Sequence, residues 1–595
     1  MVRHNYSLMS FQPLLNPIGF GASDFLELAV AALLLVFALL ARPWIEPAFR
    51  SFASKTAWCM ALLAVLPVAL RLALLWHHPV PQPDLYDEFG HLLVADTLRH
   101  LHLANPQHPF HRFFETFFVL QEPTYSSIYP IGQGAMLAIG RLLFATPWAG
   151  VLVSTGAFCS LCYWMLRGWT TPAWALAGGL LAVIEFGPLC PWMNTYWGGS
   201  LAAAAGCLVF GALPRLRESA RVRDGVFLGI GIAVHWLTRP YETTFLVVSV
   251  AVFLAPQMRS RRLLRPLQAT AAVCATALVV TLAHDRATTG SWTTMPEMLS
   301  QYQYGVPAAL TFQAPAVPHR ALTPEQQIEY RAQVAFRAPG PETLGSYLAR
   351  LEYRIRHYRF YFLAPLYLAL PAFLLAIREL RFLWAAGTLA VFAGGVNFFP
   401  AFQFHYEAAV TCLFILVSVT GLRRMSRWQA GAEAARILLV LSVAHFAFWY
   451  TLHVFDGSEI SLAMRRYETW NTINHGNPDR RILVNHELAK VPGRLLIFVR
   501  YWPQHIFQNE WVYNDADIDG ARVVWARDLG AADDEQLHRY YPDRTALLLE
   551  PDATPPKLSP YRVEAPIVPA PATPQPEHPP EKNSSQPALR FQDAR

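Results

Sequence analysis

Long apolar stretches alternate with short polar segments along the chain up to residue 452. A helix needs about 20 mainly apolar residues to cross a bilayer, so stretches close to that length predict membrane-spanning helices. About twelve such helices are expected, at residues 25–41, 56–76, 149–166, 173–190, 198–213, 225–239, 241–255, 267–284, 358–377, 382–400, 406–422 and 433–451. The first stretch lacks the residue order of a cleaved signal peptide, and we expect it to remain as a helix.

Arginine gathers in the short segments that separate these apolar stretches. Short loops rich in lysine and arginine stay on the cytoplasmic side of a membrane, so these segments are predicted to be cytoplasmic. Their arginines are Arg215, Arg217, Arg221, Arg223, Arg259, Arg261, Arg262, Arg265, Arg423, Arg424 and Arg427. Long loops at about 77–148 and 285–357 then lie outside, provided that GQGAMLAIGRLLF, residues 132–144, runs along the membrane surface instead of crossing it.

The chain beyond residue 452 has a different pattern. RLLIFV, RVVWA and TALLLE are typical of buried strands, and DEQLHRYY has the pattern of a helix. These elements predict a small α/β segment over 453–556, and the Pro-rich remainder, 557–595, is predicted to be disordered. The expected fold is an all-α polytopic membrane protein, with residues 1–452 in the membrane domain and the α/β segment on the extracytoplasmic side.

Composition supports this architecture and excludes several function classes. Hydrophobic residues make up 53% of the 595 residues and charged residues only 15%, which is too apolar for a soluble protein of this length. The net charge of +6 comes from arginines in short loops and does not indicate a nucleic-acid partner. All seven cysteines lie in or beside apolar stretches, so no disulfide framework or zinc site is predicted.

Two adjacent carboxylates, Asp87 and Glu88, lie in LYDEFGH just beyond the second apolar stretch. One interpretation is structural: Asp87 caps the helix that follows, and Glu88 lies favourably in its first turn. The other is a reactive site at the water boundary, because the same loop concentrates further titratable residues. These are His91, Asp96, Glu115, Glu122, Tyr125 and Tyr129.

The order of features around this pair resembles a known superfamily. An exit helix, an outside loop that opens with Asp-Glu, an interfacial helix and then PTYSSIYPIGQG precede the next span. This order resembles the GT-C membrane glycosyltransferases, and the protein O-mannosyltransferase and aminoarabinose-transferase-like branch is the most similar. The match is dense only from Pro83 to Gly134, and FQFHYEAAV, residues 402–410, is a weaker match to an outside-facing part of the site.

The resemblance implies a polyprenyl-phosphate-linked sugar as donor, Asp87 as catalytic base, and a bacterial inner membrane with the site facing the periplasm. The chemistry is consistent, because a sugar on a lipid phosphate already has an adequate leaving group and the acceptor hydroxyl is the weak nucleophile. A base that removes the hydroxyl proton contributes about 10²–10⁴-fold. Glu88 is predicted to orient the acceptor or to assist Asp87.

Arg239, in LTRPYET, is the predicted ligand of the donor phosphate, because an arginine at the outer end of a helix pair is costly unless it has a function. The alternatives are that it only extends toward water or pairs with Glu242. His405 and Tyr406 also lie at an outer helix end and are expected to line the same cavity, with His91 and Tyr129.

No cofactor is firmly indicated. Many relatives in the superfamily have a second acidic residue at an outside turn that reads NTYWGG here, residues 194–199, without a carboxylate. A divalent metal that bridges two acidic loops is therefore disfavoured, and hydrogen bonds from Asn194, Tyr196 or Trp197 are the expected substitute. NDADIDG, residues 514–520, resembles a calcium loop, but Ala526 stands where a bidentate glutamate is needed.

Three classes of function remain open from the sequence. A transferase predicts one outside site dominated by the first loop, whereas a transporter or flippase predicts polar groups near the membrane midplane, for which His235, Glu185 and His445 are candidates. A structural role predicts that the loop carboxylates are dispensable. An O-antigen-ligase-like enzyme with a lipid diphosphate donor is a further alternative. The expected partners are the lipid-linked sugar, a lipid, glycan or protein acceptor with a hydroxyl or amine, and membrane lipids.

Overall fold

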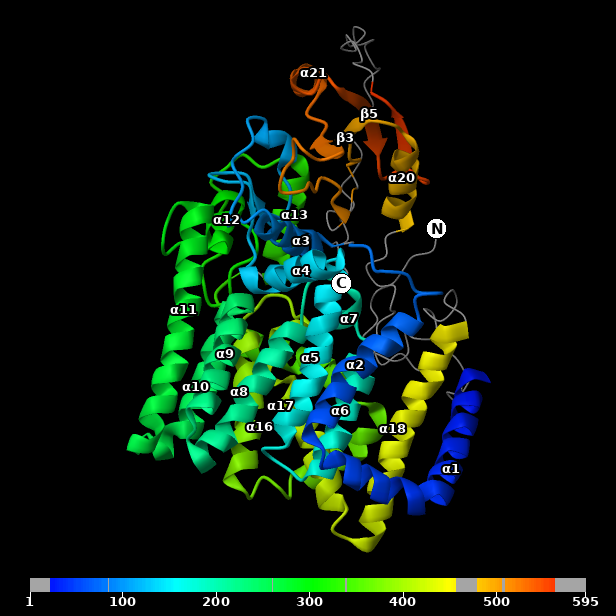
Figure 1. Cartoon of the computed structure of the whole chain (residues 1–595). Coiled ribbons are helices and arrows are strands. Elements are labelled where there is room, and N and C mark those ends of the chain that lie inside the picture. The colour runs from blue at the N-terminus through cyan, green and yellow to red at the C-terminus, as the bar shows by residue number, and fades with distance from the viewer. Residues whose placement is uncertain are drawn as a thin grey trace, which may run out of the picture.

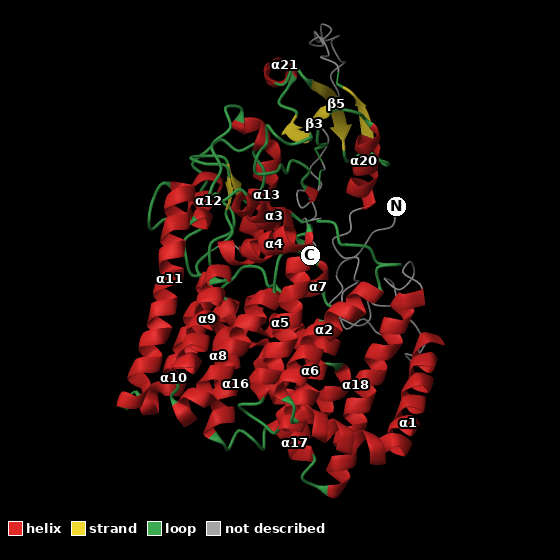
Figure 2. Cartoon of the chain, in the orientation of Figure 1, coloured by secondary structure: helices red, strands yellow, loops and turns green. Residues whose placement is uncertain are grey.

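The computed structural model describes residues 22–83, 85–258, 260–337, 340–455, 479–503, 505 and 509–561. Figure 1 shows a bundle of long helices that carries shorter helices, loops and a small sheet at one end. The bundle is helical throughout its length, and the strands lie apart from it (Figure 2). Arg259 and residues 562–595 of the stretch expected to be disordered, 557–595, lie outside the described residues.

Eleven of the twelve expected apolar stretches coincide with continuous helices, which confirms the all-α membrane domain. A short 3₁₀ turn, η6 (Phe404–Val410), leads into one of them. The helices are α1 (Ala22–Ala53), α2 (Thr56–Ala73), α5 (Trp148–Leu166), α6 (Pro172–Phe186), α8 (Ser200–Ser219), α9 (Val222–Thr238), α10 (Pro240–Leu254), α11 (Leu264–Thr289), α16 (Leu380–Val396), α17 (Thr411–Met425) and α18 (Gln429–Phe455).

The twelfth stretch, 358–377, is broken instead of continuous. It forms η4 (Arg356–Tyr361), η5 (Ala364–Ala369) and the short α15 (Leu370–Phe373). Pro365 and Pro371 explain the breaks, because proline has no backbone N–H and its ring clashes with the preceding helical turn. The expectation of a single helix there was wrong.

The bundle has the surface of an integral membrane protein. Within the described ranges, six helices are long and apolar enough to cross a membrane: Phe25–Ala53, Thr56–Ala73, Trp148–Leu166, Arg261–Thr289, Phe404–Met425 and Gln429–Phe455. Large apolar side chains lie exposed on the outer helices, including Leu33 and Leu40 at 70% and Val279 at 64%. Apolar surface on this scale requires lipid, because soluble monomers rarely expose contiguous apolar patches larger than a few hundred Å².

The arginine-rich turns share one end of the bundle, at the bottom of Figure 1. Arg423 at the end of α17 donates a hydrogen bond to Thr170 after α5, at 3.4 Å. Gln257 after α10 donates to the carbonyl of Arg217 in α8, at 3.3 Å. The shorter helices and the sheet lie at the opposite end. The two predicted sides of the membrane therefore correspond to two ends of the structure, and which end faces the cytoplasm stays a prediction.

A cysteine that replaces His102 is expected to react with a membrane-impermeant thiol reagent from outside, and a cysteine at Ser219 is not. Both side chains are exposed; His102 follows the first-loop helix α3 (Tyr86–Arg99), and Ser219 ends α8. Gly90 is unsuitable as a probe, because it is buried and a Cβ there would lie 2.7 Å from the Tyr129 ring. Labelling of intact cells measures the sidedness, with the unsubstituted protein as blank, and the reverse pattern would invert the assignment.

The first outside loop forms two helices that lie across the upper end of the bundle (Figure 1). These are α3 and α4 (Ile131–Phe144). The expectation that GQGAMLAIGRLLF runs along the membrane surface agrees with the course of α4. The second loop supplies α12 (Pro296–Tyr304), α13 (Pro324–Arg337) and α14 (Leu344–Ile355). Two short antiparallel strands, β1 (Val119–Leu120) and β2 (Ser126–Ser127), lie in the first loop.

The described part of the C-terminal segment forms a four-stranded sheet flanked by helices. The three strand-like runs and the helix-like DEQLHRYY form as predicted, whereas the expectation of disorder was wrong for Lys557–Pro560, which forms the fourth strand by pairing with its neighbour. The sheet order is β4-β3-β5-β6, in which β3 pairs in parallel with β4 and β5, and β6 is antiparallel. The elements are α20 (Asp479–Lys490), β3 (Arg494–Val499), β4 (Val523–Arg527), α21 (Ala531–Tyr540), β5 (Arg544–Glu550) and β6 (Lys557–Pro560). Phe113 and Phe114 of the first loop share a core with Leu496 and Phe498 of β3, so this unit is packed onto that loop.

Candidate active site

Asp87 lies in the first turn of α3 and does not cap it. The helix begins at Tyr86, and its N-cap is Leu85, so the capping interpretation of Asp87 is wrong. The Asp87 carboxylate accepts a hydrogen bond from the Tyr129 hydroxyl. Burial raises the pKa of Asp87 to about 6, while the Tyr129 bond and the charge of Arg239 act in the opposite direction. A carboxylate with a pKa near neutrality is well suited to accept a proton.

Glu88 is held by backbone groups on both oxygens. Its Oε2 accepts a hydrogen bond from the N–H of Leu85 at 3.2 Å, and its Oε1 accepts one from the N–H of Tyr196 at 3.0 Å. The side chain is only 1% exposed. These bonds join the start of α3 to the turn after α7 (Pro191–Asn194). We infer that Glu88 positions α3, and direct assistance to Asp87 stays a prediction.

Glu88→Gln is expected to lower the thermal stability of the protein and to reduce transfer less than loss of Asp87 does. An amide at this position turns an N–H₂ group toward one of two backbone donors, and an unsatisfied buried donor costs about 1–3 kcal/mol. A thermal melt and a transfer assay on the same preparation measure the two effects. A variant with unchanged melting temperature but little transfer would place Glu88 in the chemistry.

Gly90 allows the Tyr129 ring to lie directly on α3, because a side chain there would meet the ring at 2.7 Å. The same ring lies 4.3 Å from the His91 ring, centre to centre. Burial, and then the charge of Arg239, lowers the pKa of His91 to about 3. The imidazole is therefore neutral, and its Nδ1 has no hydrogen-bond partner among the described residues. Tyr129 thus contacts Asp87, and His91 contacts Tyr129; their role in substrate binding stays a prediction.

Arg239 lies at the junction of two helices at the same end of the bundle. It ends α9 and precedes Pro240, the first residue of α10. Its guanidinium carbon lies 5.0 Å from the centre of the Tyr406 ring, and its Nη1 lies 4.0 Å from a carboxylate oxygen of Glu242. The side chain is 21% exposed. Arg239 pairs with Glu242, as one alternative had it, and its charge also acts on Asp87 and His91.

The glycine-containing end of PTYSSIYPIGQG brings the first loop onto the end of α9. A Cβ at Gly132 would lie 2.7 Å from the carbonyl oxygen of Leu237, two residues before Arg239. Gln133 donates a hydrogen bond to the carbonyl of Tyr196 at 3.0 Å. The motif therefore holds α4 against both the helix that presents Arg239 and the turn bonded by Glu88.

His405 and Tyr406 join the site from η6, which precedes α17. The His405 ring lies 4.9 Å from the Tyr406 ring and 5.8 Å from the Trp197 ring. Phe399 packs on Tyr406 at 4.6 Å. The segment FQFHYEAAV thus contacts Arg239 through Tyr406. From the segment NTYWGG, Trp197 lies beside His405.

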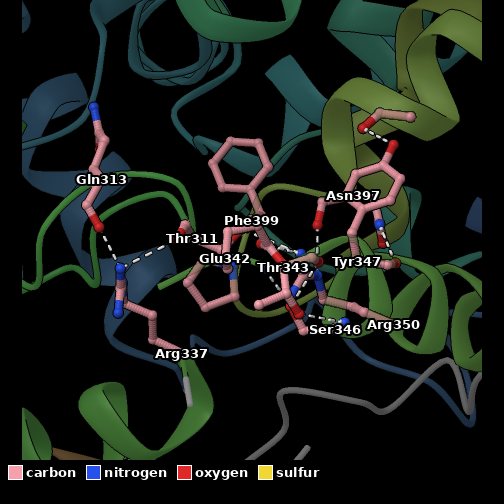
Figure 3. Close-up of polar contacts among 12 residues, drawn as sticks. Thr311, Gln313, Arg337, Glu342, Thr343, Ser346, Tyr347, Arg350, Asn397 and Phe399 are labelled. Carbon is pink, nitrogen blue, oxygen red and sulfur yellow. Dashed lines mark hydrogen bonds and ion pairs between the residues drawn. The ribbon is translucent and has the colours of Figure 1, made fainter. Parts of the chain in front are cut away.

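Three side chains of α14 hold the segment that leads to Tyr406. Figure 3 shows Tyr347 and Arg350 beside Asn397 and Phe399. Carbonyl groups at the end of a helix lack donors within that helix, and cations are favourable there. Hydrogen bonds run from Tyr347 to Gly394, from Arg350 to Asn397 and from Arg354 to Val396, at 2.8, 2.6 and 3.1 Å. The second outside loop therefore fixes the C-terminal end of α16 and the segment after it.

Glu329 of α13 is a site residue that the sequence did not reveal. Its side chain is fully buried, and its Oε1 accepts a hydrogen bond from Gln333 at 2.7 Å. Burial raises the pKa of Glu329 to about 8, and the charge of Asp87 adds to the increase. Tyr330 beside it packs in the same apolar cluster as Tyr129. The site therefore combines a carboxylate at Asp87 with a neutral carboxylic acid at Glu329.

The other titratable residues of the first loop make structural contacts. Asp96 accepts a hydrogen bond from the N–H of Ala516 at 2.9 Å, and Tyr125 donates to the carbonyl of Asn514 at 2.9 Å. Glu115 and Glu122 both pair with Arg320 of the second loop. These contacts fasten the loop to its neighbours and leave Asp87, His91 and Tyr129 for the site.

The three polar residues that were candidates for a transport pathway lie on three different helices. His235 of α9 lies 2.7 Å from the hydroxyl of Thr243, and His445 of α18 contacts Glu27 of α1. Glu185 of α6 is buried, and neither of its oxygens has a hydrogen-bond partner in the described part of the chain. A search of the described residues finds no group of three His, Cys, Asp or Glu side chains that could hold a metal ion.

No family model matches the sequence, and no curated protein matches it significantly. Among solved structures, ArnT from Cupriavidus metallidurans bound to undecaprenyl phosphate has a TM-score of 0.47 at 13% identity, over 82% of this chain and 92% of that one. An oligosaccharyltransferase of Archaeoglobus fulgidus with zinc and sulfate has 0.40 at 12%, over 75% and 60%. Archaeal AglB with an inhibitory peptide and dolichol-phosphate has 0.35 at 11%, over 83% and 69%.

The chain thus spans 60% of the length of the first of these oligosaccharyltransferases. At such TM-scores and identities, any conclusion about reaction or substrate depends on the residues of this chain.

Proposed function

We propose that this protein is an integral-membrane glycosyltransferase that moves a hexose or pentose from a polyprenyl-phosphate donor to an acceptor hydroxyl or amine. The transfer takes place on the extracytoplasmic face, in a bacterial inner membrane. The observation that carries the proposal is the convergence of Asp87, Arg239 and Tyr406 from three separate parts of the chain. A base and a cation at one end of a membrane bundle suit a donor whose sugar and phosphate lie at the lipid surface.

The proposed reaction is a single displacement at the anomeric carbon. The acceptor oxygen or nitrogen attacks that carbon as its proton passes to Asp87, and the bond between the anomeric carbon and the phosphate oxygen breaks. The electron pair remains on the phosphate, which leaves as a monoester with one additional negative charge. Arg239 stabilises this developing charge by hydrogen bonds and by Coulomb attraction.

The same residues favour a monophosphate donor over the diphosphate of an O-antigen-ligase-like enzyme. The phosphodiester of a polyprenyl-phosphate sugar carries one negative charge. Among the described residues, Arg239 is the only cation whose charge acts on Asp87. Two phosphates would bring further negative charge toward Asp87 without a second cation to balance it.

Purified protein in proteoliposomes, supplied with a radiolabelled polyprenyl-phosphate sugar and envelope extract, tests the proposal. We expect label to leave the carrier lipid and to appear in an acceptor fraction that depends on the protein. Mass analysis of envelope glycans and lipids from a deletion strain then identifies the acceptor. Label that crosses the bilayer while still attached to its carrier would instead indicate a flippase.

A further inference from the structure

A second candidate site lies at the end of the bundle opposite Asp87. A cavity of about 350 Å³ opens among the ends of α5, α8, α10 and α16, and this volume lies within the range of small-molecule sites. We name it the arginine cavity. Its lining residues are Gly168, Trp169, Pro214, Arg217, Glu218, Phe253, Gln257 and Arg381.

Positive charge exceeds negative charge around the arginine cavity. The Arg217 guanidinium carbon lies 4.9 Å from the centre of the Phe253 ring, and no ion pair joins Arg217 to a carboxylate in the described part of the chain. Arg381 pairs with Glu379 at 2.8 Å, and the Arg381 side chain is 42% exposed. Glu379 is shared with Arg424, so it neutralises only part of that charge. Glu218 is the carboxylate among the lining residues.

Two side chains that line the arginine cavity, Trp169 and Phe253, are aromatic and pack on a third ring, and we call them its floor. Trp169 stacks on Trp384 with ring centres 5.9 Å apart, and Phe253 meets Trp384 edge to face at 4.6 Å. The indole N–H of Trp169 is already bonded to the carbonyl of Phe210, so the floor offers apolar contact and no donor from that ring. A ligand with one anionic group above an apolar part suits this arrangement.

An exposed apolar strip on the lipid-facing surface begins beside the arginine cavity. On α10 it comprises Val248 and Val252, which are 53% and 59% exposed. On α16, which packs against α10, it comprises Leu380 and Leu383, which are 81% and 48% exposed. Val252 adjoins Phe253 in sequence and Leu380 adjoins Arg381, so exposed apolar side chains lie within one helical turn of the lining residues on both helices.

We propose that the arginine cavity binds the phosphate of an anionic phospholipid, with the acyl chains along the α10 and α16 strip. Basic pockets between transmembrane helices on the cytoplasmic side bind anionic lipid headgroups, and a guanidinium can hold a phosphate through two hydrogen bonds. The apolar strip favours a lipid over a soluble anion, because acyl chains can cover exposed apolar side chains and a soluble anion cannot. This site is independent of the proposed transferase activity.

Native mass spectrometry of the purified full chain with dioleoylphosphatidylglycerol tests the proposal. An arginine that contacts the headgroup contributes about 1 kcal/mol toward an anionic lipid, so Arg217→Ala/Arg381→Ala is expected to bind about 30-fold more weakly. Arg217→Lys/Arg381→Lys keeps the charge and is expected to stay within about fivefold. The matched control is Arg221→Ala/Arg223→Ala, which removes two arginines at the start of α9 that do not line the cavity, and it is expected to bind normally.

Two further ligands test whether the cavity recognises an anionic lipid or a free anion. Dioleoylphosphatidylcholine is expected to bind weakly, because its headgroup has no net charge, and inorganic phosphate is expected not to displace phosphatidylglycerol. Equal binding of both lipids, or full displacement by inorganic phosphate, would overturn the lipid assignment. If the double alanine variant fails to fold, Arg217→Gln alone is expected to weaken binding about fivefold, and normal binding by it would also overturn the proposal.

Discussion

Asp87→Asn is expected to lower sugar transfer by about two orders of magnitude or more while the protein remains folded. Asparagine keeps the size of the side chain and can still accept the hydrogen bond from Tyr129, but it cannot take a proton. Helix α3 starts at Tyr86 with Leu85 as its N-cap and does not depend on Asp87 as a cap, so the substitution leaves that start intact. Transfer in proteoliposomes and a thermal melt on the same preparation measure the two outcomes.

Glu122→Gln is the matched control for Asp87→Asn. It removes a carboxylate from the same loop, at a position that is 39% exposed and pairs with Arg320. A partly exposed ion pair contributes about 0–1 kcal/mol, so both stability and transfer are expected to stay near the unsubstituted protein. A folded Asp87→Asn protein that transfers sugar as fast as this control would defeat the proposed mechanism.

The pH dependence of kcat/KM provides a second test of Asp87. The base acts only when ionised, and its pKa is raised to about 6, so kcat/KM is expected to fall as the pH drops below about 6. The Tyr129 bond favours the ionised form. Tyr129→Phe is therefore expected to move this fall to higher pH. If the acidic limb of the kcat/KM profile does not move in Tyr129→Phe, the group that titrates in that limb is not Asp87.

The sequence predicts most of the bundle, because lipid-facing helices need long apolar runs and such runs are visible without alignment. It fails at residues 358–377, where hydropathy looks continuous while Pro365 and Pro371 interrupt the helix. Hydropathy measures transfer into lipid and does not count backbone hydrogen bonds. The strands of the C-terminal sheet were equally visible as apolar runs, except for the short edge strand β6, whose KLSP has little apolar character.

The residues of the candidate site also differ in whether the sequence reveals them. Asp87, Arg239, His405 and Tyr406 were found because each stands at the outer end of an apolar stretch, where a polar residue is unexpected. Glu329 was missed, since it lies in an ordinary amphipathic helix of a long loop and only the folded chain buries it near Asp87.

The neighbours Asp87 and Glu88 look equivalent in sequence, but the helix separates them. Successive side chains on an α-helix point about 100° apart. One carboxylate therefore meets Tyr129, and the other meets the backbone at Leu85 and Tyr196.

Arg239→Ala is expected to lower kcat/KM for the lipid-linked donor by about 10²-fold or more, the usual effect of removing a donor that stabilises a developing charge. Arg239→Lys is expected to lose less, because lysine keeps the charge and loses only the planar fork. The same removal is expected to shift the acidic limb of kcat/KM to higher pH, since the Arg239 charge lowers the pKa of Asp87. Donor titrations at several pH values measure both effects together.

A loss of transfer in Arg239→Ala has a competing cause, because the substitution also leaves the buried carboxyl group of Glu242 without its cation. The double variant Arg239→Ala/Glu242→Gln separates the two causes. If the orphaned carboxyl group is the cause, the double variant recovers transfer. If the phosphate needs the guanidinium, it remains as impaired as Arg239→Ala, because glutamine restores neutrality at position 242 and supplies no charge to the leaving group. Wild-type donor use in Arg239→Ala would leave Arg239 with only its contacts to Tyr406 and Glu242, and the leaving phosphate would then need another cation.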